Sequence, residues 1–122
     1  MYVIAKRFQF SASHRLESLP EGHPCRRLHG HNYTVEVQLA AAELDSHGFV
    51  VDFAELCPVR DFLRDIYDHR HLNDVLDGPP TSERLAQTIY AWCEANLPVA
   101  HLLHAVRVSE TDATWAEYRR AT

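Results

Sequence analysis

Two stretches in which side-chain character alternates residue by residue constrain this chain more than any other feature. From Tyr2 to His14, apolar residues recur at the even positions, interrupted by Lys6, and polar residues fill the odd positions from Arg7 onward. The alternation returns from His29 to Ala41, with the apolar residues at odd positions. Successive side chains of a β-strand point to opposite faces, so each stretch predicts a long strand with one face in a core.

The same alternation places three imidazoles on the apolar faces. His14 ends the first stretch on its apolar side, and His29 and His31 begin the second on its apolar side. If the strands pair antiparallel across the loop of residues 15–28, the three side chains meet at one end of the sheet. Three histidines with an open fourth position are the ligand set of catalytic zinc. Nine histidines in 122 residues agree with a metal protein.

Cys25 lies in that loop, four residues before His29 and directly before Arg26 and Arg27. As a fourth ligand, its sulfur would close the site and make the metal structural. As a base, it would stand beside the metal and act on a bound substrate. The residue types alone leave both possibilities open.

The rest of the chain predicts two helices and two further strands. Asp52 and Glu55 form a near capping box before a helix whose apolar stripe runs from Phe53 to Ile66, and Pro58 predicts a kink or a later start. Thr81 is expected to cap a second helix that ends near residues 96–98. Two strands at about 102–109 and 113–119 close the chain, and residues 68–80 are expected to form a polar loop.

This order of elements, ββααββ, predicts a single α+β domain over residues 1–122, with a four-stranded antiparallel sheet and two helices on one face. The exposed edges of such a sheet favour oligomerisation. Asp68 and His69 follow the first helix as a carboxylate–imidazole pair suited to relaying protons. Glu110 continues the apolar side of the third strand, an unusual place for a carboxylate.

Composition excludes several classes of protein. The net charge of −5, without a long basic run, excludes a general nucleic-acid binder. The N-terminal stretch has no signal-peptide pattern, and no apolar run approaches the roughly 20 residues that span a bilayer. Three widely spaced cysteines do not form a disulfide framework. We therefore expect a cytoplasmic protein with reduced thiols and no membrane partner.

A series of short motifs, in collinear order over essentially the whole chain, resembles the 6-pyruvoyltetrahydropterin synthase family, most closely its bacterial 6-carboxytetrahydropterin synthase branch. The motif that contains Cys25, His29 and His31, together with the upstream His14, is the most specific part. The matching segments are Ser13-His14-Arg15-Leu16, Pro20-Glu21-Gly22-His23, Cys25-x-x-x-His29-Gly30-His31, Val51-Asp52-Phe53-Ala54-Glu55-Leu56, Asp68-His69, Leu72-Asn73, Pro80-Thr81-Ser82-Glu83 and Glu110-Thr111.

This resemblance implies a tunnelling fold (T-fold) whose sheets join across subunits into a barrel, usually a homohexamer with active sites at subunit interfaces. It also implies a role for each candidate residue. The zinc ligands would be His14, His29 and His31, the catalytic base Cys25, the proton relay Asp68 and His69, and the anchor of the pterin ring Glu110. Arg15, Arg26 and Arg27 are candidates for contacts to a triphosphate, and a purely solvated position at the surface is the open alternative for each.

The activity implied is that of a zinc-dependent lyase in queuosine (7-deazaguanine) biosynthesis. It would convert 7,8-dihydroneopterin triphosphate to 6-carboxy-5,6,7,8-tetrahydropterin, acetaldehyde and triphosphate. One alternative is 6-pyruvoyltetrahydropterin synthase, which eliminates triphosphate from the same substrate and keeps the side-chain carbons. Another is a non-catalytic binding module stabilised by a zinc ion that Cys25 and the three histidines hold.

Overall fold

The two alternating stretches form the long central hairpin of the fold. In the computed structural model, which describes residues 1–121, β1 (Tyr2–His14) and β2 (His29–Ala41) pair antiparallel along their whole length. The register sets His14 opposite His29 and Tyr2 opposite Ala41. Both predicted strands are confirmed, including their end residues.

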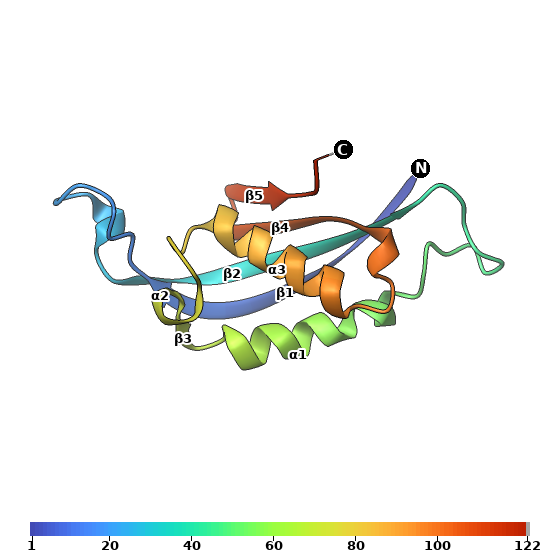
Figure 1. Cartoon of the computed structure of the whole chain (residues 1–122), viewed down its shortest axis with the longest axis horizontal. Coiled ribbons are helices and arrows are strands. Elements are labelled where there is room, and N and C mark those ends of the chain that lie inside the picture. The colour runs from blue at the N-terminus through green and yellow to red at the C-terminus, as the bar shows by residue number, and fades with distance from the viewer. Residues whose placement is uncertain (122) are drawn as a thin grey trace.

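Alternation divides this hairpin into two faces. The covered face packs against the helices and is buried, whereas the open face carries polar and charged side chains (Figure 1). Fully burying one large apolar side chain contributes about 1.5–3 kcal/mol, so the covered face supplies much of the stability. The covered face consists of Phe8, Phe10, Ala12, His14, Tyr33, Val35, Val37 and Leu39, and the open face of Arg7, Gln9, Ser11, Ser13, Thr34, Glu36 and Gln38.

The first predicted helix begins later than its capping signal. The Asp52 carboxylate accepts the Ala54 N–H at 2.9 Å, but it caps a 3-10 turn, η2 (Phe53–Leu56). The α-helix α1 (Cys57–Ile66) starts after this turn, with Pro58 in its first turn, where the missing N–H costs nothing. The later start that Pro58 predicted is therefore confirmed.

Two members of the predicted apolar stripe are exposed, and Phe62 is half-buried. Phe53 is 53% exposed, because the 3-10 turn shifts the helical phase before α1 begins, and Ile66 is 41% exposed at the last residue of α1. The second helix agrees with its prediction. It is α3 (Ser82–Asn96), and the Thr81 hydroxyl accepts the Arg84 N–H at 3.2 Å as its cap.

The prediction of an irregular loop over residues 68–80 is wrong. After a left-handed turn at His69 (φ 59°), the chain forms β3 (Arg70–His71) and the one-turn helix α2 (Leu72–Val75). β3 runs parallel to β1 and pairs Arg70 with Ala12, so the sheet has five strands rather than four. A two-residue strand is too short to show any periodicity in the sequence.

The last two strands are β4 (Leu103–Thr111), after the short turn η3 (Ala100–Leu102), and β5 (Thr114–Tyr118). The strand order is β3-β1-β2-β4-β5. The loop of residues 15–28, which contains the turn η1 (Pro24–Arg26), lies at the same end of the molecule as β3 and α2 (Figure 1). The N-terminus lies toward the other end.

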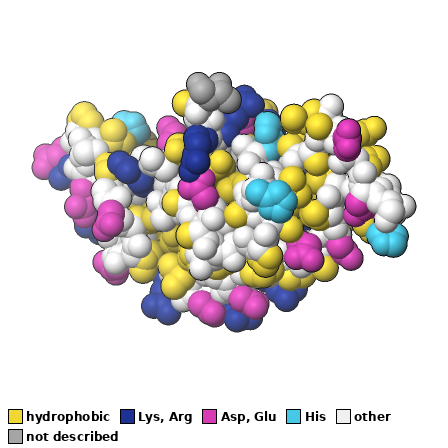
Figure 2. Space-filling view, turned by 45° about the vertical axis from the view of Figure 1, so that its right-hand side comes forward, with side chains coloured by type: hydrophobic (Ala, Val, Ile, Leu, Met, Phe, Trp, Pro, Cys, Tyr) yellow, Lys and Arg dark blue, Asp and Glu magenta, His cyan; other side chains and the backbone are white. Residues whose placement is uncertain are grey.

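The surface agrees with the charge balance of the sequence. On the face drawn in Figure 2, Lys and Arg side chains of the described residues are interspersed with Asp and Glu rather than gathered into one basic patch. Within residues 1–121, none of the helices has both the length and the apolar character needed to cross a membrane.

Candidate metal centre

Three imidazoles converge where the covered face ends. Because His14 and His29 are register partners, their rings meet across the hairpin, and His31 follows on the same side of β2. One ring nitrogen from each lies within 4.8 Å of the others, and the Nε2 atoms of His14 and His29 are 2.9 Å apart. His14 is only 1% exposed, so this group is at the edge of the core rather than on the surface.

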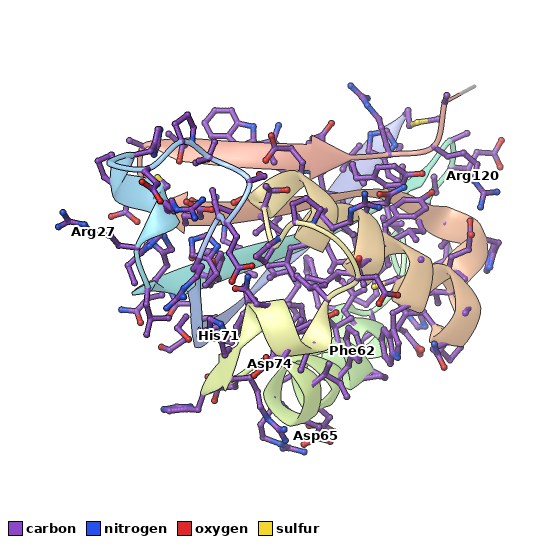
Figure 3. All side chains as sticks on the ribbon, turned by 60° about the vertical axis from the view of Figure 1, so that its left-hand side comes forward. Arg27, Phe62, Asp65, His71, Asp74 and Arg120 are labelled. Atoms are coloured by element: carbon purple, nitrogen blue, oxygen red, sulfur yellow. The ribbon has the colours of Figure 1, made fainter. Side chains whose placement is uncertain are left out.

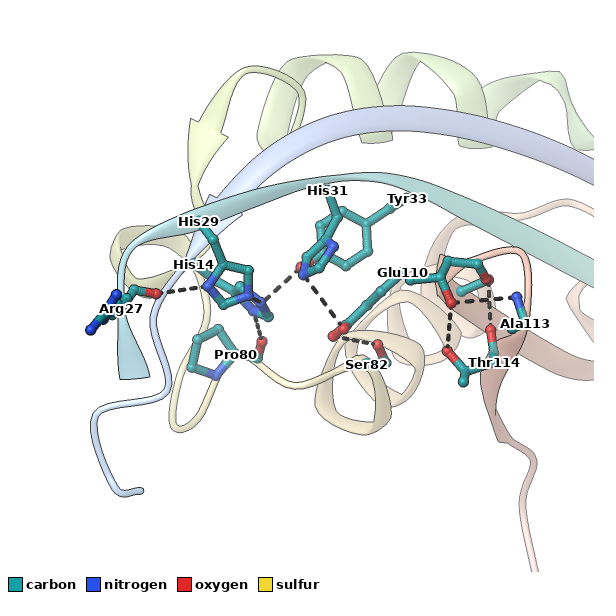
Figure 4. A network of polar contacts seen from close by, with 12 residues as sticks. His14, Arg27, His29, His31, Tyr33, Pro80, Ser82, Glu110, Ala113 and Thr114 are labelled. Atoms are coloured by element: carbon teal, nitrogen blue, oxygen red, sulfur yellow. Dashed lines mark hydrogen bonds and ion pairs between the residues drawn. The ribbon is translucent and has the colours of Figure 1, made fainter. Parts of the chain in front are cut away.

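Backbone carbonyls determine which nitrogens face inward. His14 Nδ1 donates to the Pro80 carbonyl at 2.8 Å, and His29 Nδ1 donates to the Arg27 carbonyl at 2.7 Å (Figure 4). A carbonyl oxygen only accepts, so both Nδ1 atoms carry the hydrogen and both Nε2 atoms present lone pairs. Two lone pairs that face each other at 2.9 Å repel unless a cation lies between or beside them.

His31 completes the donor set. Its Nε2 is buried and has no hydrogen-bond partner among the described residues. Burial lowers the pKa of His31 despite the opposing charge of Glu110, and the neighbouring His14 and His29 lower it further. A neutral imidazole with an unpartnered buried nitrogen is the form that binds a metal. The three histidines therefore fit a metal ion that they could hold together.

Glu110 lies beside this centre. Its Oε2 is 3.5 Å from His31 Nε2, and its Oε1 accepts the Ser82 hydroxyl at 2.9 Å (Figure 4). Ser82 begins α3, and Pro80, two residues earlier, receives the hydrogen bond from His14. The short segment before α3 thus orients both a histidine of the centre and the carboxylate next to it.

The structure also joins Asp68 to His69, at the edge of the sheet. Asp68 Oδ2 is 3.0 Å from His69 Nδ1, and Asp68 Oδ1 accepts the Ser11 N–H at 2.9 Å. The hydrogen bond from the Ser11 N–H lowers the pKa of Asp68, burial opposes this, and the contact with His69 lowers the pKa further. His69 is 83% exposed and lines, together with His31, an open cavity of about 640 Å³.

Cys25 does not join the histidines. It lies half-buried in η1, and among the described residues the side chains close enough to share one ion are only His14, His29 and His31. Sequence reasoning missed the partners that orient the site. The Pro80 and Arg27 carbonyls are backbone groups without a sequence signal, whereas Ser82 lies in one of the motifs that carry the family resemblance.

Known proteins match both the sequence and the fold. The family model described as 6-pyruvoyl tetrahydropterin synthase matches residues 3–121. The chain is 40% identical over 125 residues to a Synechocystis 6-carboxy-5,6,7,8-tetrahydropterin synthase, covering 97% of this chain and 93% of that protein. It is 32% identical over 130 residues to the 6-pyruvoyl tetrahydrobiopterin synthase of Dictyostelium discoideum, covering 96% and 95%.

The structure superposes on that of Caenorhabditis elegans 6-pyruvoyl tetrahydropterin synthase with a TM-score of 0.86 and 27% identity, covering 98% of this chain and 96% of that chain. The α+β tunnelling fold predicted from the sequence is therefore confirmed, with one strand more than expected. The family model and the relatives also confirm the resemblance read from the motifs. The chain belongs to the 6-pyruvoyl tetrahydropterin synthase family and is a lyase of that family.

Proposed function

We propose that this protein is a zinc-dependent carbon–carbon lyase that converts 7,8-dihydroneopterin triphosphate to 6-carboxy-5,6,7,8-tetrahydropterin, acetaldehyde and triphosphate in queuosine biosynthesis. The observation that carries the proposal is the donor set, in which backbone carbonyls orient two Nε2 atoms toward each other and the buried Nε2 of His31 stands beside Glu110. The Synechocystis relative, named for the same product, supports the reaction.

Each candidate residue has a role in this reaction. The three histidines would hold the zinc ion, which would supply Lewis-acid chemistry for the hydroxyl groups of the substrate side chain. Glu110, which Ser82 orients, accepts hydrogen bonds from the amino and ring N–H groups of the pterin and fixes its position. Cys25 removes a proton from the side-chain carbon next to the ring, and His69, which Asp68 orients, returns protons to later intermediates.

The position of Cys25 supports its role as a base. A Cys-plus-three-His zinc site would need the sulfur among the converging nitrogens, and in residues 1–121 Cys25 is not in that group. We expect Cys25→Ala to abolish turnover while zinc content stays at the wild-type level. Cys57→Ala, at another half-buried cysteine, is the matched control and should retain both. Loss of zinc along with turnover in Cys25→Ala would contradict the assignment.

Product analysis tests the reaction itself. Zinc-loaded protein supplied with 7,8-dihydroneopterin triphosphate should release acetaldehyde and triphosphate in equal amounts. The Dictyostelium relative favours the alternative product, because its name describes the pyruvoyl branch. A pyruvoyl pterin without acetaldehyde would establish that alternative. A chelator that unfolds the protein, in the absence of any turnover by the zinc-loaded form, would instead support a zinc-stabilised binding module.

The proposed enzyme acts in the cytoplasm as a homohexamer. Support comes from the sheet edges, because β3 covers only Ala12 and Ser13 of β1 and β5 has β4 as its one partner in the described chain. Unpaired edges of this length are suited to pairing with further copies. Light scattering of the eluted protein would measure the mass of the assembly, and a monomer would contradict the proposal.

A further inference from the structure

The loop that carries Cys25 closes on itself through its backbone. The Leu16 N–H donates to the Cys25 carbonyl at 3.0 Å, which joins the two arms of the loop. The Cys25 N–H donates to His23 Nδ1 at 3.1 Å. Both backbone groups of Cys25 therefore have partners inside the loop, and the direction of its thiol depends on how firmly these arms are held.

Arg26 is the side chain that ties the two arms together. Its guanidinium Nη1 donates to the carbonyl of Glu17 at 2.6 Å and to the carbonyl of Leu19 at 2.9 Å. Its own N–H donates to the His23 carbonyl at 3.0 Å, which fixes the start of the side chain. Hydrogen bonds from a charged donor are about twice as strong as neutral ones. The two bonds from the guanidinium therefore stabilise a loop in which no residue is fully buried.

Arg27, the next residue, is different. It is exposed, and although its backbone carbonyl accepts the hydrogen bond from His29, its guanidinium makes no hydrogen bond or ion pair among the described residues. Figure 3 shows its side chain extending away from the loop. The sequence offered both arginines as candidates for binding a triphosphate, and the structure separates them into one that bonds to its own loop and one that faces outward.

We propose that Arg26 is a positioning residue that holds the Cys25 loop and thereby fixes the thiol relative to the histidine centre. The inference rests on the proposed function, in which Cys25 is the base. Proton abstraction requires the sulfur within hydrogen-bond reach of the reacting carbon, and a misplacement of about 1 Å can reduce a rate by about 100-fold. Arg26 acts through the loop, with no contact to the reacting atoms.

The test compares Arg26→Ala, Arg26→Lys and Arg27→Ala in the zinc-loaded protein. Arg26→Ala should lower kcat by about 10- to 100-fold with little change in KM. It should also raise the rate at which iodoacetamide alkylates Cys25, measured by peptide mass spectrometry against Cys57 in the same sample. Arg26→Lys should recover part of both effects, since an ammonium also donates to carbonyls. Arg27→Ala should leave the alkylation of Cys25 unchanged.

Two results would overturn the inference. If Arg26→Ala matches the wild type in kcat and in Cys25 alkylation, the loop does not need the guanidinium. If Arg26→Ala and Arg27→Ala raise KM equally and leave kcat unchanged, both arginines bind substrate instead. Should Arg26→Ala not fold by circular dichroism, Arg26→Lys decides the same two questions. Alkylation requires no turnover, so an inactive wild type would count against the proposed function and leave the test of Arg26 intact.

Discussion

The covered and open faces of the central hairpin use the same two strands in opposite ways. On the covered face, Tyr33, Val35 and Val37 have no exposure, and the apolar row continues directly into the histidines. On the open face, charged side chains pair across the strands, with Arg7 3.1 Å from Glu36. Because neighbours in sequence lie on opposite faces, the same kind of polar group meets a different environment at each position.

A polar side chain therefore has charged and hydrogen-bonding neighbours on the open face, whereas a polar atom on the covered face can be buried without a hydrogen-bond partner. Burial opposes ionisation of Glu36 on the open face, but hydrogen bonds from Gln38 and Arg7, with the charges of Arg7 and Arg107, outweigh it and lower its pKa. His31 Nε2, on the covered face, is buried and has no hydrogen-bond partner among the described residues, with the Glu110 carboxylate oxygen 3.5 Å away. A buried nitrogen without a hydrogen-bond partner is an arrangement that a bound ligand would complete, and this points to a ligand site at the histidine end of the covered face.

The largest effect should come from the core of the covered face. Phe10 is 3% exposed and stacks on Tyr33 and Tyr67, with ring centroids 5.1 and 5.6 Å away. We expect Phe10→Ala to lower the free energy of unfolding by about 3–5 kcal/mol, through lost burial and the cavity left behind. The matched change on the open face, Gln9→Ala, should stay within about 0.5 kcal/mol. Urea denaturation measures both, and similar losses would contradict the division into two faces.

Alternation was sufficient to predict the hairpin from the sequence, because a two-residue period extends over most of each strand. It also predicted that His14, His29 and His31 would share a face and an end of the sheet, since residue parity fixes the face and antiparallel pairing fixes the end. The structure brings the three side chains together. Long, regular elements leave a pattern that a single sequence can reveal.

The features that the sequence could not predict are very short elements and hydrogen bonds to backbone groups. Two hydrogen bonds hold the start of β3 beside β1: the Ser11 N–H donates to the Asp68 carboxylate, and the His69 N–H donates to the Ser11 carbonyl. A strand of two residues is too short to show an alternating pattern in the sequence. The carbonyl partners of His14 and His29 come from whichever residue the fold brings there, so residue type carries no signal. The sequence could not distinguish Arg26 from Arg27 for the same reason, because the Arg26 guanidinium bonds to backbone carbonyls that only the folded loop brings within reach.

A smaller loss of stability is expected from a change at the His14 end of β1. Asn73 of α2 accepts the Arg15 N–H and donates to the Arg15 carbonyl, both at 2.9 Å, and so holds the residue that follows His14. Removing two hydrogen bonds of about 1 kcal/mol each should cost Asn73→Ala about 2 kcal/mol of stability. Because the end of β1 then loosens, we also expect metal affinity to fall by roughly tenfold.

The matched control for this change is Asn96→Ala. Asn96 makes one side-chain bond, to the Trp92 carbonyl at 2.9 Å, at the end of α3. It should lose about half as much stability, or about 1 kcal/mol, and retain full metal affinity. Competition with a chromophoric chelator measures the affinity. Equal metal affinity in the two variants would show that Asn73 has no special role at the histidine end.

The smallest effect should come from the open face and should depend on pH. Glu36 has a folded-state pKa below its ordinary value of 4.5, so folding favours its ionised form. Its contribution to the free energy of unfolding is therefore fully present above pH 4.5 and is lost as the pH falls through the lower, folded-state pKa. Since its partner Arg7 is 76% exposed, water screens the pair and the contribution is small.

Glu36→Gln should accordingly lower stability slightly at neutral pH and flatten its decline in acid, because the substituted amide does not titrate. Denaturation midpoints measured from about pH 7 down to about pH 3 would show this as two curves that converge at the acid end. Glu43→Gln, at an exposed glutamate, should follow the wild-type curve throughout. If Glu36→Gln runs parallel to the wild type instead, the open-face carboxylate is not stabilised by its neighbours, and the contrast with the covered face rests on burial alone.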